Sequence, residues 1–494
     1  MSKLKKIIKQ LGDNELNVIY QSLKKSDAHK SAELLRHFRE NKLSDKEIKN
    51  KLGVHNNAFY TLRSRLNEKI ENHIIEQVET PRTALVHRVA SINEILHTKN
   101  KTIATATLKK LEKELLDYDL SNELTLIYKA LKKLNVYSPD YFEYSQLYNR
   151  HVAYMLVVDK VEDMLADYFK RHSQFLLSGD LHYKESLTLL VEQIRKSYDL
   201  YGSHRLYVYY NCVYLFHKIM VEEVDISSHE NELNEAFEQV HQYFTQYHMD
   251  TTYHNLQWVF LYLRMLFHFK KGHYGMVDEN LYRLKDHALN LISNYRLYTS
   301  PVYFLILKIE RALALGAQKN LIADNHKIFK SLHVDKDDML NWYVFTYYDA
   351  LSFYYNDKPE QAIEIVNTFL EEADLKLHPK IYIETKLLLC HLYYSVNNLE
   401  EVEYNVAQVQ RQIRIVKKEN HTSAYLFMKI VKSSLSNVDF QKRQKKVCRY
   451  VDEFHHHPIP LTSPLRLLNS NLYIPEKESQ KSESSYETYS MKNT

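Results

Sequence analysis

Histidine is the residue type in this sequence that most invites a search for chemistry, with 26 histidines among 494 residues. Glu and His stand three apart at Glu238 and His241 and again at Glu453 and His456, a spacing that places two metal ligands on one helix face. Neither pair has the further carboxylates of a di-iron bundle beside it, and no His-Glu-x-x-His zinc motif occurs. The run 455–457 fits a solvated histidine tract. We therefore expect no metal site.

Nucleophilic and nucleotide chemistry have equally little support. The three cysteines, Cys212, Cys390 and Cys448, are widely spaced and odd in number, which fits a reducing compartment and excludes a disulfide framework or a Cys-based zinc site. Only Gly272 and Gly275 lie close together, so the sequence holds no glycine-rich phosphate loop, and no Gly-x-Ser-x-Gly elbow occurs. We predict that the protein is not an enzyme and binds no cofactor.

Residues 43–70, LSDKEIKNKLGVHNNAFYTLRSRLNEKI, carry the most specific local pattern. They resemble the helix-turn-helix of sigma-factor region 4 and related bacterial regulators, with Gly53 at the turn and Phe59, Leu62 and Leu66 on the buried side of the second helix. The resemblance implies that the other side of this helix would enter the major groove of DNA. The residues that would contact DNA are His55, Asn56, Asn57, Tyr60, Arg63, Ser64, Arg65 and Lys69.

Lys49 departs from that family pattern, because the family has a small residue where the two helices cross. A lysine can bend outward and leave the crossing intact. The alternative interpretation is an ordinary helical hairpin that caps the rest of the protein or docks another protein. Residues 1–80 hold 16 Lys and Arg against 11 Asp and Glu, whereas the whole chain has a net charge of +4, so general affinity for nucleic acid is not expected.

The elements that must position these residues are predicted to be helices. Seven glycines and nine prolines are few for 494 residues, and folds built on β-turns, bulges and phosphate loops need more glycine. No apolar run reaches the length of a membrane span, and the basic start has no apolar segment of signal-peptide length. We expect an all-α protein of the cytoplasm.

Four regions are predicted along the chain. Residues 1–80 read as a module of four short helices, with a boundary at Pro81 because proline disfavours helix in the residue before it. Residues 81–200 read as a spacer or early hairpins, with a long helix from Tyr141 to Leu177. Residues 201–450 form helical repeats. Residues 451–494 are rich in proline and then in polar residues, and we expect a disordered tail.

Self-similarity is the main feature of residues 201–450. Five segments share an aromatic-rich helix, a polar turn and a second helix with a small or aliphatic anchor residue, at separations of 41, 44, 41 and 40 residues. The anchors are Ala236, Val277, Leu321, Ala362 and Val402. Residues 353–362, FYYNDKPEQA, resemble the tetratricopeptide repeat, which implies a solenoid of antiparallel helical hairpins. A HEAT-like array, whose period is closer to 41, remains open.

The 40 tyrosines also suit such an array. Tyrosine rings fill space between helices while the hydroxyl reaches a polar partner at the edge; the sharper alternative is an aromatic groove for peptides or bases. As a whole the chain resembles a loosely defined group of uncharacterised helical proteins from Bacteroidetes bacteria. We expect a non-catalytic scaffold or adaptor that binds a protein or peptide on a concave repeat surface. The alternative is a transcriptional regulator in which residues 43–70 bind DNA and the repeats sense a partner.

Overall fold

The protein is all-α in the computed structural model, which describes residues 3–10, 13–26, 28–40, 43–76, 81–222, 226–247, 251–328, 334–416 and 421–475. These residues contain helices joined by turns and no strand. None of the described helices combines the length and apolar character that a membrane crossing requires. The chain divides into two compact units, one of Met1–Ser145 with Met249–Thr251, the other of Gln146–His248 with Thr252–Thr494.

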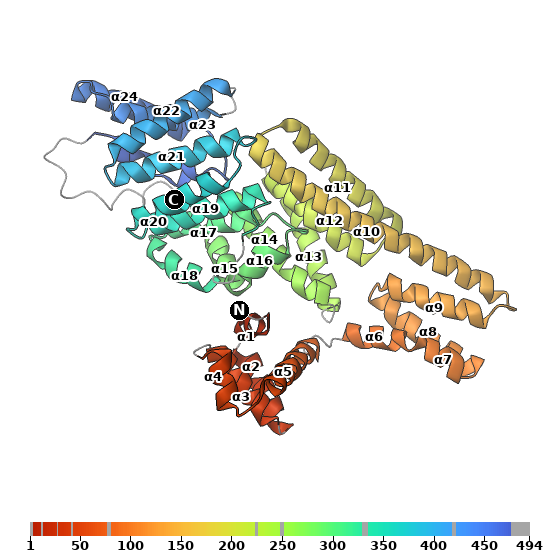
Figure 1. Ribbon diagram of the computed structural model, residues 1–494. Coiled ribbons are helices and arrows are strands. Elements are labelled where there is room, and N and C mark those ends of the chain that lie inside the picture. The colour runs from red at the N-terminus through yellow and green to blue at the C-terminus, as the bar shows by residue number, and fades with distance from the viewer. Residues whose placement is uncertain are drawn as a thin grey trace. The chain divides into compact units, whose positions relative to one another are not determined.

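The first unit contains nine helices before the long helix α10, as far as it is described (Figure 1). They are α1 (Lys3–Gln10), α2 (Asp13–Lys25), α3 (His29–Glu40), α4 (Asp45–Lys51), α5 (Asn56–Glu76), α6 (Pro81–Ala90), α7 (Ile92–Thr98), α8 (Lys101–Asp117) and α9 (Ser121–Leu134). Helices α1 to α5 share a core around Leu34, Phe38, Ile48 and Leu66, each almost fully buried. The described residues of the N-terminal module thus form five helices, where four were predicted.

The second unit starts within α10 (Asp140–Ser178), which agrees with the long helix predicted at 141–177. Its remaining elements are α11 (Leu181–Tyr201), α12 (His204–Phe216), the π-helical η1 (His217–Val221), η2 (Ile226–His229), α13 (Glu230–Gln246), α14 (Thr251–Lys270), α15 (Tyr274–Leu284), η3 (Lys285–His287), α16 (Ala288–Asn294), α17 (Val302–Ala314), η4 (Gln318–Asn320), α18 (Leu321–Ile328), α19 (Met339–Tyr354), α20 (Pro359–Glu372), α21 (Pro379–Ser395), α22 (Leu399–Ile415), α23 (Thr422–Ser434), α24 (Phe440–His456), η6 (Pro464–Leu467) and η7 (Ser470–Tyr473).

A single core runs through this second unit, and it includes regions that the sequence pattern had set apart. Val161, Leu165 and Tyr168 of α10 and Ile194 of α11 belong to it and are at most 1% exposed. Within the region 81–200, for which a spacer or early hairpins were predicted, α11 and the second half of α10 are packed parts of the second unit. The large buried side chains on these helices show that both helices pack into the core of the second unit.

The turns between paired helices repeat one backbone geometry. The residue five positions before the anchor is left-handed in four of them: Gly272 (φ 72°), Gly316 (φ 65°), Asp357 (φ 59°) and Asn397 (φ 58°). The following N–H then donates to a carbonyl five residues back: His273 to His268, Ala317 to Ala312, Lys358 to Phe353 and Asn398 to Tyr393. This is the Schellman motif, which ends a helix and satisfies its last carbonyls. Glycine, aspartate and asparagine are the residues that tolerate this conformation.

The first helices of successive pairs pack on one another. Helix α17 contacts α19, α19 contacts α21, and α21 contacts α23, while α19 pairs with α20, α21 with α22 and α23 with α24. In Figure 1 these helices follow one another from green to blue. We call the four helices α17, α19, α21 and α23 the first-helix layer.

Candidate functional site

The α4–α5 pair places the predicted DNA-binding residues on one helix and the turn before it. Ser44 accepts a hydrogen bond from the Glu47 N–H while the Glu47 side chain accepts from the Ser44 N–H, so a capping box starts α4. Gly53 has φ 60°, and the Val54 N–H donates to Lys49 O, which closes α4 with the same motif as the repeat turns. The hydrogen bonds from Ser44 lower the pKa of Glu47.

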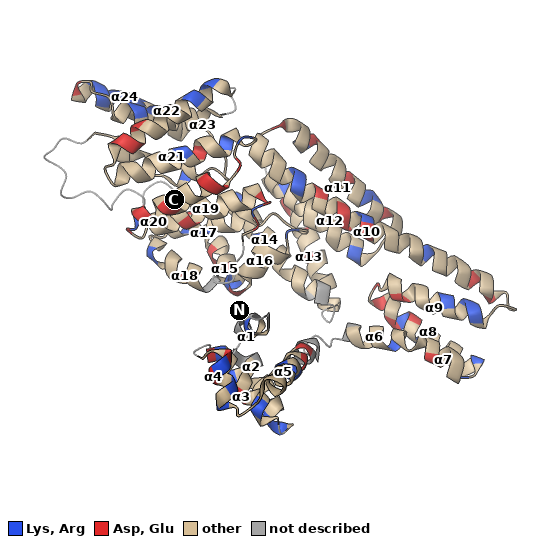
Figure 2. Ribbon diagram, viewed as in Figure 1, with Lys and Arg blue, Asp and Glu red and all other residues tan. Residues whose placement is uncertain are grey.

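Seven of the eight predicted DNA-binding residues are exposed, and Arg63 is half-buried. Figure 2 shows Lys and Arg on this part of the chain. Tyr60, Arg63 and Ser64 also border a pocket of about 350 Å³ that Leu4 of α1 helps to line. Lys49, the departure from the family pattern, turns its ammonium group outward to donate to Asn56 Oδ1. The Lys49 side chain therefore does not fill the space where α4 and α5 cross. It forms a hydrogen bond with Asn56, which is one of the eight predicted DNA-binding residues.

The five predicted repeat anchors are all buried. Val277, Ala362 and Val402 are fully buried, Leu321 is 3% exposed and Ala236 is 8% exposed. Four of them stand five residues after a left-handed turn residue, and the same relationship joins Asp119 (φ 51°) to the fully buried Leu124 at the start of α9. The α8–α9 pair of the first unit thus shares the turn geometry, which the sequence pattern had not revealed.

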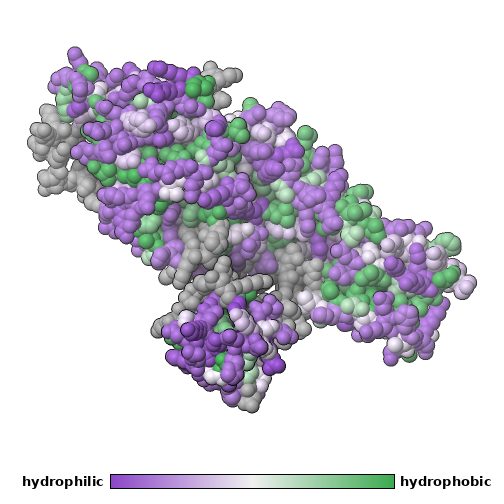
Figure 3. Space-filling view, viewed as in Figure 1, coloured by the Kyte–Doolittle hydropathy of each residue, from purple (hydrophilic) through white to green (hydrophobic). Residues whose placement is uncertain are grey.

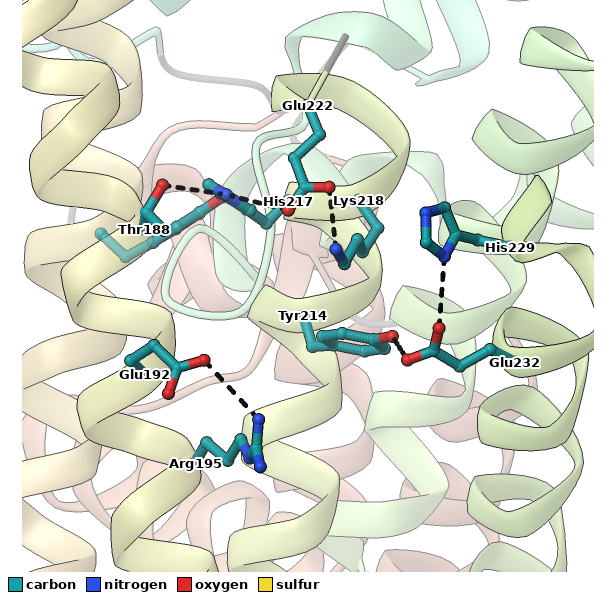
Figure 4. Close-up of polar contacts among 10 residues, drawn as sticks. Thr188, Glu192, Arg195, Tyr214, His217, Lys218, Glu222, His229 and Glu232 are labelled. Carbon is teal, nitrogen blue, oxygen red and sulfur yellow. Dashed lines mark hydrogen bonds and ion pairs between the residues drawn. The ribbon is translucent and has the colours of Figure 1, made fainter. Parts of the chain in front are cut away.

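A polar cluster at the end of α12 had no signal in the sequence (Figure 4). The helix ends in the π-helical turn η1, a local geometry that is frequent at functional sites. His217 in this turn lies 3.0 Å from the Tyr168 hydroxyl and 3.4 Å from that of Thr188. Burial lowers the pKa of His217 to about 4, although Glu222, 3.7 Å away, opposes the effect. The ring is neutral near pH 7 and acts as a hydrogen-bonding core residue.

The C-terminal segment 461–473 is folded onto the first-helix layer. Leu465 and Tyr473 are fully buried members of the second unit's core. The element η6 contacts α21 and α23, and η7 contacts α23 and α24. Residues 451–475 thus adopt defined structure, which corrects the disordered tail predicted from 451, because leucines and a tyrosine in this proline-rich stretch supply apolar surface for burial. The rest of that predicted tail, 476–494, lies outside the described residues.

Side chains of three first helices hold this segment. Arg466 Nη2 donates to Glu310 Oε1 of α17 at 2.9 Å. The Tyr355 hydroxyl, just past α19, donates to the Leu467 carbonyl. His391 of α21 lies 3.1 Å from the Tyr473 hydroxyl through Nδ1 and 3.2 Å from the Tyr354 hydroxyl through Nε2. The first-helix layer therefore contacts three kinds of group in the C-terminal segment: a charged side chain, a main-chain carbonyl and an aromatic hydroxyl.

Buried polar groups lie beside these contacts. Glu384 of α21 is 3% exposed and accepts a hydrogen bond from the Tyr343 hydroxyl at 2.8 Å. Burial raises the pKa of Glu384, while Lys380 and Tyr343 oppose the rise. Many other tyrosines fill space between helices: Tyr262, Tyr347 and Tyr348 are at most 1% exposed. The tyrosines of the layer thus pack in or against the core, and Tyr355, just past α19, contacts the C-terminal segment.

Two further surface features are chemically plain. A pocket of about 290 Å³ is lined by Trp342, Asp349 and Glu372. Lys336 pairs with Glu372 at 2.7 Å and lies over the indole ring of Trp342. Hydrophobic residues gather over α6 to α9 (Figure 3), among them Ile103, which is 51% exposed. In the part of the chain that the structure describes, no three His, Cys, Asp or Glu side chains are grouped to hold a metal ion.

Comparisons of the chain with protein-family models, with curated proteins and with solved structures gave no match.

Proposed function

We propose that the protein is a non-catalytic interaction scaffold whose first-helix layer binds a short peptide segment of a partner. The observation that carries the proposal is the seating of residues 461–473 on that layer. Tyr355 recognises a main-chain carbonyl, which any peptide offers, and Glu310 recognises a cationic side chain, which sets a preference. The surface already holds one segment built of two short 3₁₀-helical turns, so it has contacts that another segment could use.

The repeated turn supports a second part of the proposal, that the helix pairs form a solenoid of tetratricopeptide-like hairpins. A left-handed residue followed after five positions by a buried anchor recurs at intervals of 44, 41 and 40 residues from Gly272 to Asn397. Units that each pack on the next generate an extended inner surface, the usual binding surface of repeat proteins. The free cysteines, two of them buried, support a reducing and hence cytoplasmic location.

Selection from a displayed library of random peptides tests the proposal on the full chain. Enriched peptides should bind with micromolar or tighter affinity, and hydrogen exchange should slow in the first-helix layer when they bind. Retention of no peptide above background would contradict the proposal. A selection against the Tyr355→Phe chain is the matched comparison, since that change removes only the hydroxyl that contacts a peptide carbonyl.

A second candidate function, DNA binding by α5, has its own observation in its favour. The exposed polar face of α5 follows a tight, glycine-dependent turn, and the module has a separate core. Binding of the full chain to duplex DNA should weaken on Arg63→Ala and Arg65→Ala and should fall steeply with salt, because phosphate contacts release counterions. Arg36→Ala on α3, whose side chain is 61% exposed, is the control. Failure to bind duplex DNA at low salt would remove this candidate.

A further inference from the structure

We infer that the first-helix layer is specific for a peptide in which an arginine stands between leucines, and that the chain's own residues 464–468, PLRLL, are a built-in competitor for it. The inference rests on the proposed function and adds the chemistry of the partner. It also assigns Glu310 as the residue that selects the arginine.

The contact between Arg466 and Glu310 shows what this subsite prefers. Glu310 lies on α17, and its Oε1 accepts a hydrogen bond from Arg466 Nη2 at 2.9 Å. Burial raises the pKa of Glu310, while the charge and hydrogen bond of Arg466 oppose the rise. A carboxylate with limited access to water is stabilised best by a cation that supplies hydrogen bonds as well as charge, which favours arginine over lysine.

Arg466 forms a hydrogen bond with only one of the two carboxylate oxygens of Glu310. Glu310 Oε2 is buried and has no hydrogen-bond partner among the described residues. Arginine can donate two parallel hydrogen bonds to a carboxylate, so a peptide that presents its guanidinium edge-on would satisfy both oxygens. Buried polar atoms nearly always have a partner, and leaving one without costs free energy. The internal segment is therefore a weaker ligand than the subsite allows.

A second unsatisfied group lies in the same place. The Tyr347 hydroxyl, on a side chain 1% exposed, has no hydrogen-bond partner among the described residues. Burial raises the pKa of Tyr347; the charges of Glu384 and Glu310 raise it further and that of Arg466 opposes them, so the phenol lies within electrostatic range of the arginine subsite. Two buried polar atoms without partners at one subsite indicate that another occupant would form more hydrogen bonds than residues 464–468 do.

The positions on either side of the arginine are apolar. Leu465 is fully buried, and Leu467 and Leu468 are each 4% exposed, all within the second unit's core. Burying leucine side chains supplies most of the affinity, while the arginine provides the selectivity. Tyr355 adds a contact to the carbonyl of residue 467, which holds the peptide in register without reading its side chain. Leucines flanking one arginine are thus the matching partner chemistry.

Fluorescence anisotropy with a labelled synthetic peptide of residues 461–473, LTSPLRLLNSNLY, tests the inference on the full chain. Arg466→Ala weakens the competitor, so the Arg466→Ala chain should bind the peptide at least about tenfold more tightly than the unaltered chain. Adding Glu310→Ala to that chain, or replacing the arginine of the peptide by alanine, should abolish the gain. Arg449→Ala, which breaks the exposed pair with Glu453 on α24, should bind as the unaltered chain does.

Hydrogen exchange on the unaltered chain gives a second readout that does not depend on any variant folding. Excess peptide should speed exchange in residues 461–473 and leave α20 and α22 unchanged. Absence of both peptide binding and faster exchange would overturn the inference. So would a peptide-independent dimer that exchanges the segment between two copies, which light scattering would detect. If library peptides bind without needing Glu310, the proposed function stands and this inference fails.

Discussion

Arg466 and Glu310 lie 156 residues apart in the sequence, and their side chains meet at 2.9 Å. The pair ties the segment after the last long helix to α17, four helical hairpins earlier by sequence order. This contact places the C-terminal segment against α17, on the layer proposed to bind peptides. It also joins the stability of the second unit to the occupancy of the proposed binding surface.

Removal of this ion pair should destabilise the second unit moderately. Arg466→Ala should lower the free energy of unfolding by about 1 to 2 kcal/mol, less than for a fully buried pair, because the side chains are 30% and 26% exposed and solvent screens them. Urea denaturation measures the change. Glu310→Ala combined with Arg466→Ala should cost less than the two single losses added. Additive losses would show that the two groups do not interact.

Acid should weaken the docking of the C-terminal segment through His391. Burial lowers the pKa of this ring to about 4 from 6.5. The unfolded chain therefore takes up a proton below pH 6.5 that the folded chain refuses until about pH 4. The free energy of unfolding therefore falls by about 1.4 kcal/mol per pH unit as the pH is lowered from 6.5 to 4. Above pH 6.5 His391 causes no such loss.

The His391→Phe variant isolates this contribution. Its unfolding free energy should depend less steeply on pH between 6.5 and 4 than that of the unaltered chain, by about the same 1.4 kcal/mol per unit. Phe427→Leu, a change in a ring that packs against His391, alters packing without titrating and should keep the original slope. Equal slopes for the unaltered and His391→Phe chains in urea titrations would show that the imidazole is not held neutral.

The left-handed turn residues should respond to substitution according to their backbone angle. At Asn397, with φ 58°, alanine should lower the free energy of unfolding by about 1 kcal/mol relative to glycine, because a Cβ atom is disfavoured in this conformation. Glu403→Ala at an exposed site of α22 serves as the control and should change stability by less than about 0.5 kcal/mol. Equal stabilities of Asn397→Ala and Asn397→Gly would exclude the turn geometry.

The anchors should tolerate no added volume. Ala362 is fully buried at the α19–α20 pair, so Ala362→Leu should destabilise the protein by about 1 to 3 kcal/mol through overpacking. Gln361→Leu adds a similar side chain at the neighbouring exposed position and should be nearly neutral. Thermal unfolding compares the two variants. Similar melting temperatures for both would mean that the anchor does not lie at a close helix approach.

Much of the fold can be predicted from the sequence, because helical proteins show apolar residues at helical spacing and contain little glycine. The helix α10 at Asp140–Ser178 and the burial of Val277, Ala362 and Val402 agree with those signals. The ordered segment 461–475 was missed because its prolines and short leucine run have no helical period, and its partners, such as Glu310, lie far away in the sequence. Contacts of that range leave no local pattern.

The candidate surfaces were predictable to different degrees. The exposure of Tyr60 and Arg65 follows from helix spacing alone, once α5 is placed. The π-helical turn at His217 and the unsatisfied Oε2 of Glu310 depend on tertiary packing, which sequence spacing cannot supply. The turn residues were partly predictable. Asp357 and Asn397 occupy the position that glycine occupies in other units, and the positive φ that all of them share explains why these residue types alternate there.

Reversal of the charge preference at Glu310 tests the central claim most directly. Anisotropy would compare two labelled peptides of residues 461–473, one with arginine and one with glutamate at position 466, on the Arg466→Ala chain and on the same chain with Glu310→Arg added. The account predicts that the first chain prefers the arginine peptide and the second prefers the glutamate peptide. Equal binding of both peptides by both chains, or binding by neither, would contradict it.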